Sequence, residues 1–182
     1  MNRPAGGAQR ETIHRGVKFD LELVTIPGPG GTPIKREVVR HPGAVVILPI
    51  LEEPGGGRQV VLIRNERIAV GRTLWELPAG TLEPMEKPEE CAPRELEEET
   101  GYRAATLTPL ARFHTTPGLT DELMHAFVAT GLTHVGQRLE ADERLTVHPR
   151  PVAEALAMVD SGEMTDAKSM LTLLMAVRNG IL

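Results

Sequence analysis

The sequence has one cysteine, no long apolar run and no excess of positive charge. A single cysteine in 182 residues excludes a disulfide framework and a thiolate zinc site. No apolar run approaches the roughly 18 residues that span a bilayer. Acidic residues outnumber basic ones by 25 to 20, which argues against binding to a nucleic-acid backbone or, through a basic helix, to a membrane surface. The first ten residues also lack the apolar core of a signal peptide, so we expect a soluble, cytoplasmic globular protein.

The length of the chain favours one domain with a small appendage. Residues 1–10 are Gly, Ala, Pro and polar, and they predict a disordered start. Residues 11–42 contain two strand-like stretches on either side of a Pro-Gly-rich loop at 27–31, which predicts a small antiparallel β unit. Residues 43–182 are expected to form the main domain.

The main domain alternates strand patterns with helix patterns. Residues 44–51 are nearly all apolar, which is typical of a strand buried on both faces. Residues 87–100 predict a helix, because Pro88 suits the first helical position and Gly101 suits the stop. Further strands are expected at 59–64, 107–115, 123–130 and 145–148, and further helices at 151–160 and 166–178. This order predicts an α/β (α+β) fold with helices on both faces of a mixed central sheet.

The helix expected at 87–100 carries the densest run of carboxylates in the chain. Glu95, Glu98 and Glu99 are separated by three and four positions, so their side chains share one helix face. Like charges in this arrangement destabilise a helix unless something neutralises them. A divalent cation such as Mg²⁺, which takes oxygen ligands, would do so. The alternative interpretation is a solvated acidic face without a ligand.

The spacing around this helix resembles the Nudix box. That motif has a Gly, five residues, a Glu, seven residues, then Arg-Glu-aliphatic-any-Glu-Glu-any-Gly and an apolar residue. The residues in register here are Gly80, Glu86, Arg94, Glu95, Leu96, Glu98, Glu99 and Gly101. Two residues depart from the usual pattern: Tyr102 replaces the final aliphatic residue, and Pro93 removes an amide near the start of the helix, which predicts a kink there.

The resemblance implies a Nudix-type α/β/α sandwich that hydrolyses a nucleoside diphosphate linked to another moiety, with Mg²⁺ or Mn²⁺ as the cofactor. Glu95 and Glu99 are then the expected main metal ligands, together with the carbonyl of Ala79. Glu98 is expected to be a further ligand, directly or through water. Glu98 and Arg94 are also counted as catalytic, because Arg94 lies four residues earlier and can orient that carboxylate.

The expected source of the general base is the acidic loop at 140–143. In the resembling enzymes the base is often a Glu on a loop after the box, and it must lie within hydrogen-bond reach of the attacking water. Glu143 fits best when counted from the following strand, and Glu140 and Asp142 are alternatives. The alternative interpretation is that this acidic loop is exposed and has no catalytic role. For Glu86, before the helix, we weigh a structural hydrogen bond against a direct catalytic role.

Segments outside the box resemble the ADP-ribose pyrophosphatase branch, which also acts on other nucleotide sugars. The similarity covers about residues 11–180 and rests on motifs at 36–44, 64–71, 75–80 (WELPAG), 116–122 and 166–168. It implies attack of water on a phosphorus of ADP-ribose, with AMP and ribose 5-phosphate as products. It also implies a homodimer in which the N-terminal β unit helps to close the partner's site.

The residues expected to bind the substrate are Arg36, Arg67, Trp75, Glu76, Gly118 and Glu122. The two arginines suit phosphate oxygens, because a guanidinium fork matches their geometry. The two glutamates suit a sugar or an adenine edge, and Gly118 belongs to the Pro-Gly loop beside Glu122. Trp75 is the only tryptophan, and it is either a base-stacking residue or a core or interface anchor.

Two other functions stay open at this point. The first is hydrolysis of another nucleotide, such as a dinucleoside polyphosphate, a nucleoside triphosphate or a nucleotide cofactor. The second is a non-catalytic Nudix fold that only binds a nucleotide sugar. The presence of Glu95, Glu98 and Glu99 together argues against the second, since a binding module has no need of all three.

Overall fold

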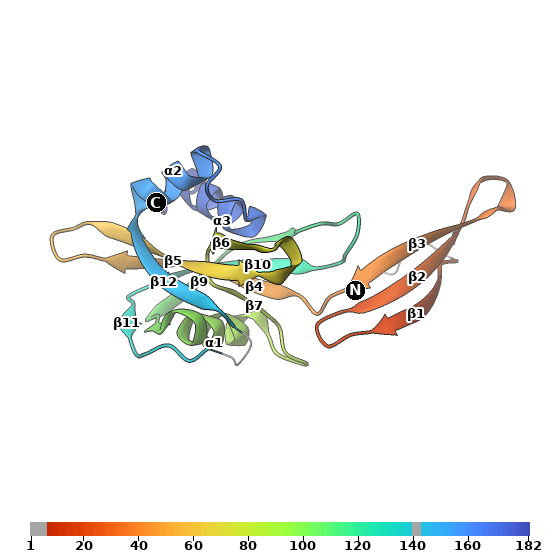
Figure 1. The fold of residues 1–182 in the computed structure, drawn as a ribbon, viewed down its shortest axis with the longest axis horizontal. Coiled ribbons are helices and arrows are strands. Elements are labelled where there is room, and N and C mark those ends of the chain that lie inside the picture. The colour runs from red at the N-terminus through yellow and green to blue at the C-terminus, as the bar shows by residue number, and fades with distance from the viewer. Residues whose placement is uncertain (1–6, 140–142) are drawn as a thin grey trace.

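The computed structural model describes residues 7–139 and 143–182, which form a small N-terminal sheet and a larger sandwich beside it (Figure 1). The small sheet is antiparallel, in the order β1 (Gln9–Arg15), β2 (Asp20–Pro27) and β3 (Pro33–Arg40). The first strand-like stretch of the sequence is therefore a hairpin, closed where Gly16 N donates to the carbonyl of Phe19 at 3.0 Å. Strand β1 begins at Gln9, two residues before the predicted start of this unit.

The larger sheet is mixed, as predicted. Its strands follow the order β12-β5-β4-β10-β9, with β6 beside β5 and β7 beside β4, and β10 runs parallel to β4 while the other pairs are antiparallel. The strands are β4 (Ala44–Glu52), β5 (Arg58–Arg67), β6 (Arg72–Glu76), β7 (Ala79–Thr81), β9 (Thr106–His114), β10 (Leu123–Thr130) and β12 (Leu145–Pro151). The remaining short elements are the pair β8 (Tyr102–Arg103) and β11 (Thr133–His134) and the 3-10 turns η1 (Pro29–Gly31) and η2 (Ile68–Val70).

Helices cover both faces of this sheet, which confirms the predicted α/β/α sandwich (Figure 1). Alternate side chains of β4 point to opposite faces, so Val45 and Ile47 pack with α1 (Pro88–Thr100). Val46 and Leu48 pack instead with α2 (Val152–Asp160) and α3 (Ala167–Arg178). None of the helices in the described part of the chain is long and apolar enough to cross a membrane.

Helix α1 begins and ends where the sequence predicts. Pro88 is its first residue, and Gly101 ends it in the left-handed conformation at φ 72°. A side chain at Gly101 would also place its Cβ 2.7 Å from the backbone nitrogen of Gln137, so both conformation and space require glycine. The helix continues through Pro93 to Thr100. Two glutamates of its acidic face, Glu95 and Glu99, are buried.

Candidate active site

Two glutamates of α1 are buried against the short strand β7. The carboxylate of Glu99 accepts a hydrogen bond from the backbone N–H of Ala79 at 2.8 Å. The carboxylate of Glu95 lies directly against Gly80, because a Cβ built on Gly80 would stand 1.8 Å from Glu95 Cδ. The glycine that opens the box is thus required by the close approach of a helix carboxylate to the strand. The structure brings together Glu95, Glu99 and Ala79, which the sequence predicted as neighbours at a metal.

Burial makes this pair of carboxylates unusual. It raises the pKa of Glu95 to about 7, against the positive charge of Arg94, and the negative charges of Glu98 and Glu143 raise it further. Burial also raises the pKa of Glu99 to about 8, although the hydrogen bond from Ala79 lowers it. The negative charges of Glu95 and Glu143 raise this pKa further. Two acidic groups therefore share a site that holds too little positive charge to keep both ionised.

The chemistry of this donor set fits a divalent cation. Carboxylate oxygens are the ligands that Mg²⁺ prefers, and a doubly charged ion would supply the missing positive charge. Within residues 7–139 and 143–182, no three acidic, imidazole or thiol side chains converge closely enough to hold an ion by themselves. Water, a backbone carbonyl or substrate phosphates would complete the shell, as is usual for Mg²⁺.

Arg94 lies at the centre of the acidic side chains of the box. Its Nε and Nη2 atoms donate to the two oxygens of Glu86, both at 2.9 Å. Its Nη1 atom donates to Glu98 at 2.9 Å and lies 2.9 Å from an oxygen of Glu95. The hydrogen bonds from Arg94 lower the pKa of Glu86 to about 2. Glu86 therefore makes a structural hydrogen bond, which was one of its two predicted roles. By binding Nε and Nη2 of Arg94, it leaves Nη1 to donate to Glu98.

The loop expected to carry the general base is described only in part. Glu140 and Asp142 lie outside the described residues. Glu143 is described, and its negative charge raises the pKa of both Glu95 and Glu99.

The segments on either side of this loop are attached to the active-site elements. On the near side, Gln137 Nε2 donates to the carbonyl of Glu99 at 2.6 Å, and Arg138 N donates to the carbonyl of Glu98 at 3.0 Å. On the far side, Glu66 N of β5 donates to the carbonyl of Arg144 at 3.1 Å. No pattern in the sequence points to these contacts, because each joins groups far apart in the chain.

Arg67 and Glu76, two of the predicted substrate-binding residues, bind each other. Arg67 donates from Nε and Nη2 to the two oxygens of Glu76, at 2.8 and 2.6 Å. Glu76 is fully buried and also accepts from Lys168 Nζ at 2.6 Å. Burial alone would raise the pKa of Glu76, but the two cations outweigh it and leave that pKa below its ordinary value. Glu76 thus lies behind Arg67, and its direct contact with a ligand stays a prediction.

Trp75 is held on the opposite face of β6 from Glu76. It packs against the core beneath α2 and α3, with the ring of His148 edge-on at 5.2 Å. The guanidinium carbons of Arg64 and Arg150 lie 5.2 and 5.5 Å from its ring centre. Its indole N–H donates to Glu163 at 2.9 Å. These contacts fit the predicted role of an anchor, and base stacking stays a prediction.

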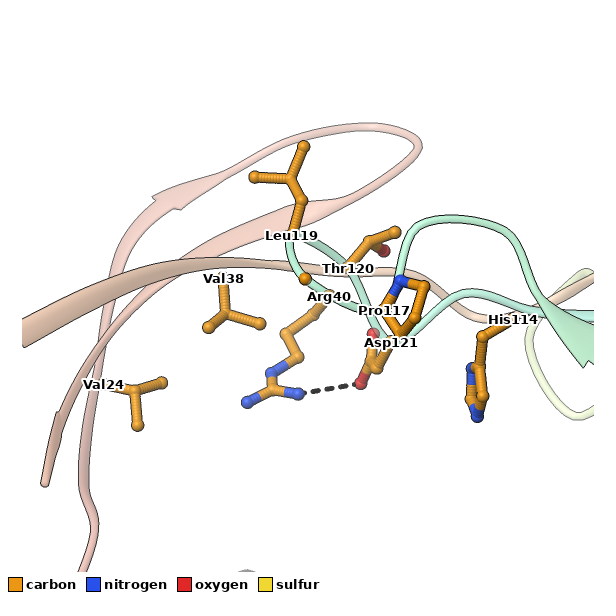
Figure 2. Close-up of a pocket in the computed structure, with 9 residues that line it drawn as sticks. Val24, Val38, Arg40, His114, Pro117, Leu119, Thr120 and Asp121 are labelled. Carbon is orange, nitrogen blue, oxygen red and sulfur yellow. Dashed lines mark hydrogen bonds and ion pairs between the residues drawn. The ribbon is translucent and has the colours of Figure 1, made fainter.

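The other three candidates lie on the N-terminal sheet and on the loop before β10. Arg36 is exposed on β3 and donates to the carbonyl of its neighbour Lys35 at 2.9 Å. Glu122 accepts from the hydroxyl of Thr115, and Gly118 lines a hollow of about 330 Å³. Figure 2 shows this hollow between β3 and the loop before β10, with an ion pair between two of the residues that line it.

That ion pair ties the N-terminal sheet to the main domain. Arg40 Nη1 donates to Asp121 at 2.9 Å (Figure 2), and the other oxygen of Asp121 accepts from the backbone N–H of His41 at 3.0 Å. Val39 N donates to the carbonyl of Leu119 at 2.9 Å. The loop that carries Gly118 and Glu122 is therefore fixed by the end of β3.

This combination of fold and acidic helix defines a family. The NUDIX domain family matches residues 40–173, and the chain belongs to it. The chain is 41% identical over 162 residues to the ADP-ribose pyrophosphatase of Bacillus subtilis (strain 168), covering 88% of this chain and 85% of that protein. It is 40% identical to the ADP-ribose pyrophosphatase of Mycobacterium tuberculosis (strain ATCC 25618 / H37Rv), covering 86% and 75%. A crystal structure of an ADP compounds hydrolase superposes over all of both chains with a TM-score of 0.79 at 22% identity, which supports the fold. The resemblance inferred from the sequence is confirmed.

Proposed function

We propose that this Nudix protein hydrolyses the pyrophosphate bond of a nucleotide sugar, with ADP-ribose as the preferred substrate. The observation that carries the proposal is the buried pair Glu95 and Glu99, held against Ala79 and Gly80. A site with two buried carboxylates attracts a divalent cation, and a cation in turn attracts a diphosphate. The names of the two similar pyrophosphatases supply the substrate class.

Each residue of the site has a role in this reaction. A Mg²⁺ or Mn²⁺ ion held by Glu95, Glu99 and the Ala79 carbonyl would neutralise charge on the phosphoryl oxygens and activate the attacking water. Glu98 would complete the metal shell, directly or through water, in the orientation that Arg94 gives it. The guanidinium group of Arg67 would bind phosphate oxygens.

The general base is proposed to be Glu143, which would accept the proton of the attacking water. Its support is the electrostatic effect of Glu143 on the two buried carboxylates. Glu140 and Asp142 stay alternatives. The products from ADP-ribose would be AMP and ribose 5-phosphate.

A substrate panel tests the proposed function. The full chain is incubated with Mg²⁺ and, separately, with ADP-ribose, GDP-mannose, diadenosine tetraphosphate or ATP, and the products are separated by chromatography. We expect the highest kcat/KM with ADP-ribose, and almost no activity in Glu99→Gln. Preference for a polyphosphate would replace the proposed substrate with another nucleotide. Binding of ADP-ribose by calorimetry without any turnover would instead support a non-catalytic binding module.

We also propose that the chain forms a homodimer through residues 11–42, with Arg36 reaching the partner's site. A three-stranded sheet is marginal by itself, and this one leaves large apolar side chains exposed at Ile13, Phe19 and Ile26. Light scattering is expected to give twice the chain mass of 19.8 kDa. A monomer at micromolar concentration would contradict the proposal. A cytoplasmic location stays a prediction from the sequence.

A further inference from the structure

A chain of four charged side chains runs from the first turn of α3 to Arg67. Asp166 precedes α3 and lies 2.9 Å from Lys168 Nζ. Lys168 donates to Glu76 at 2.6 Å, and Glu76 accepts from Arg67 at 2.8 and 2.6 Å. Lys168 is 92 residues from Glu76 in sequence, and its side chain is 11% exposed. This network of four side chains therefore joins α3 to β6 and β5.

The charges of this network balance, with two carboxylates and two cations. Burying charges costs free energy unless each one is paired, and apolar residues often stabilise a core as well or better. In the described part of the protein, no buried side-chain nitrogen or oxygen lacks a hydrogen-bond partner. A fully paired but costly network favours a role in fixing geometry, beyond a role in stability.

The geometry that it fixes is the orientation of the Arg67 guanidinium group. Arg67 has five N–H donors, and Glu76 binds the edge formed by Nε and Nη2. The Nη1 side of the fork is thereby directed away from Glu76, and 41% of the side chain is exposed. Glu76 is three residues before Ala79, whose backbone N–H donates to Glu99 at 2.8 Å, so the residue that binds Arg67 is close along the chain to the strand that holds the proposed metal ligands.

The first turn of α3 also holds the backbone between Arg67's partner and the metal ligands. The hydroxyl of Ser169 accepts from Leu77 N at 2.7 Å and donates to Asp166. Leu77 lies between Glu76 and Ala79, the residue whose N–H binds Glu99. The same helix turn thus fixes the positions of both the predicted phosphate-binding group and the metal-binding strand.

We propose that Lys168, acting through Glu76, is a positioning residue that presents the Nη1 side of Arg67 to the substrate phosphates. The inference rests on the proposed function in assigning Arg67 to the phosphates. Without Lys168, Glu76 loses one of the two cations that fix its carboxylate, and Arg67 loses its single orientation. In the wild type, the role of Glu76 under this proposal is to orient Arg67, and it has no need to contact the sugar or the base.

A double-mutant cycle on ADP-ribose hydrolysis tests this proposal. Lys168→Met keeps the length of the side chain and removes its charge, and Arg67→Met removes the phosphate contact. We expect Lys168→Met to raise KM about tenfold with kcat less affected, the scale of one charge-assisted hydrogen bond. In the Arg67→Met background the same change should have less than a twofold effect. Equal losses in both backgrounds would overturn the proposal.

Two further variants separate positioning from general stability. Lys168→Arg keeps a cation and should restore most of the lost KM. Arg178→Met removes an exposed charge from the other end of α3 and should leave KM unchanged. Failure of Lys168→Arg to recover any function, together with a fall in Tm as large as that of Lys168→Met, would assign Lys168 to stability alone.

A measurement without substrate keeps the proposal testable if the proposed function fails. The side-chain Nε–H of Arg67 is assigned by NMR from its loss in Arg67→Met. In the wild type we expect one sharp signal protected from exchange with water, because Nε donates to a buried carboxylate. In Lys168→Met we expect a broadened or shifted signal, and in Lys168→Arg a signal close to wild type. An unchanged signal in Lys168→Met would overturn the proposal whatever the enzyme hydrolyses.

Discussion

Replacing Glu99 with glutamine should make the metal-free protein more stable while abolishing its activity. Glu99 is buried, and its pKa in the folded chain is about 8, against an ordinary value of 4.5. The folded state therefore holds the Glu99 proton more tightly than the unfolded state does. Glutamine has no charge to bury, and its side-chain oxygen can still accept the hydrogen bond from Ala79.

The size of the effect follows from the shift in pKa. Below pH 4.5 the carboxyl is protonated in both states, so it adds nothing to the pH dependence of stability. As the pH rises from 4.5 to 8, the unfolded state releases the proton and the folded state keeps it, and stability falls. Each pKa unit corresponds to about 1.36 kcal/mol, so the cost at pH 8 is on the order of 4 kcal/mol. For a chain of this length, that is roughly 10 °C in Tm.

Thermal unfolding in EDTA at pH 4.5 and pH 8 measures this difference. We expect Glu99→Gln to unfold well above the wild type at pH 8, and at nearly the same temperature at pH 4.5. The matched control is Glu89→Gln, which changes an exposed glutamate in the first turn of the same helix. Its free energy of unfolding should fall by only about a few tenths of a kcal/mol at either pH, through the lost interaction with the helix dipole. Saturating Mg²⁺ should stabilise the wild type by about 3 kcal/mol at 100 times its Kd, and Glu99→Gln much less. A variant no more stable than the wild type at pH 8 would refute the reasoning.

Three further predictions follow from the same site. Gly80→Ala should abolish activity and destabilise the fold by about 1–3 kcal/mol, measured by denaturant unfolding, because the new Cβ would overlap Glu95; wild-type kcat would contradict this. Arg94→Met should weaken Mg²⁺ binding roughly tenfold or more in calorimetry, since Glu86 and Glu98 lose their shared partner; unchanged affinity would assign Arg94 to stability only. Mg²⁺ binding at pH 7 should release at least half a proton per site, detected from the buffer dependence of the binding enthalpy, because the two buried carboxylates titrate near neutral pH; a proton count of zero would contradict their raised pKa values.

The features that the sequence predicted best are local in the chain. Pro88 and Gly101 mark the ends of α1 because each suits one backbone position whatever surrounds it. The apolar run at 44–51 predicts a strand covered on both faces, and β4 has α1 on one face and α2 and α3 on the other. The spacing of the acidic residues placed Glu95 and Glu99 on one helix face, and both lie buried against β7.

The features that the sequence did not predict depend on contacts between distant segments. The hairpin between β1 and β2 turns at Gly16 to Phe19, which has none of the strong turn dipeptides. The partnership of Lys168 with Glu76 joins residues 92 positions apart, so neither propensity nor periodicity can show it. Glu86 and Arg94 are only eight positions apart, but their pairing depends on the path of the loop between β7 and α1, which no sequence pattern shows.

The release of AMP from ADP-ribose, with Mg²⁺ and with EDTA, tests the central claim most directly. We predict turnover by the wild type that requires the divalent ion, equal amounts of AMP and ribose 5-phosphate, and a loss of at least a hundredfold in kcat in Glu99→Gln, about the effect of removing one main electrostatic contribution. Full activity in EDTA, or in Glu99→Gln, would contradict the assignment of the buried carboxylates on α1 to a catalytic metal.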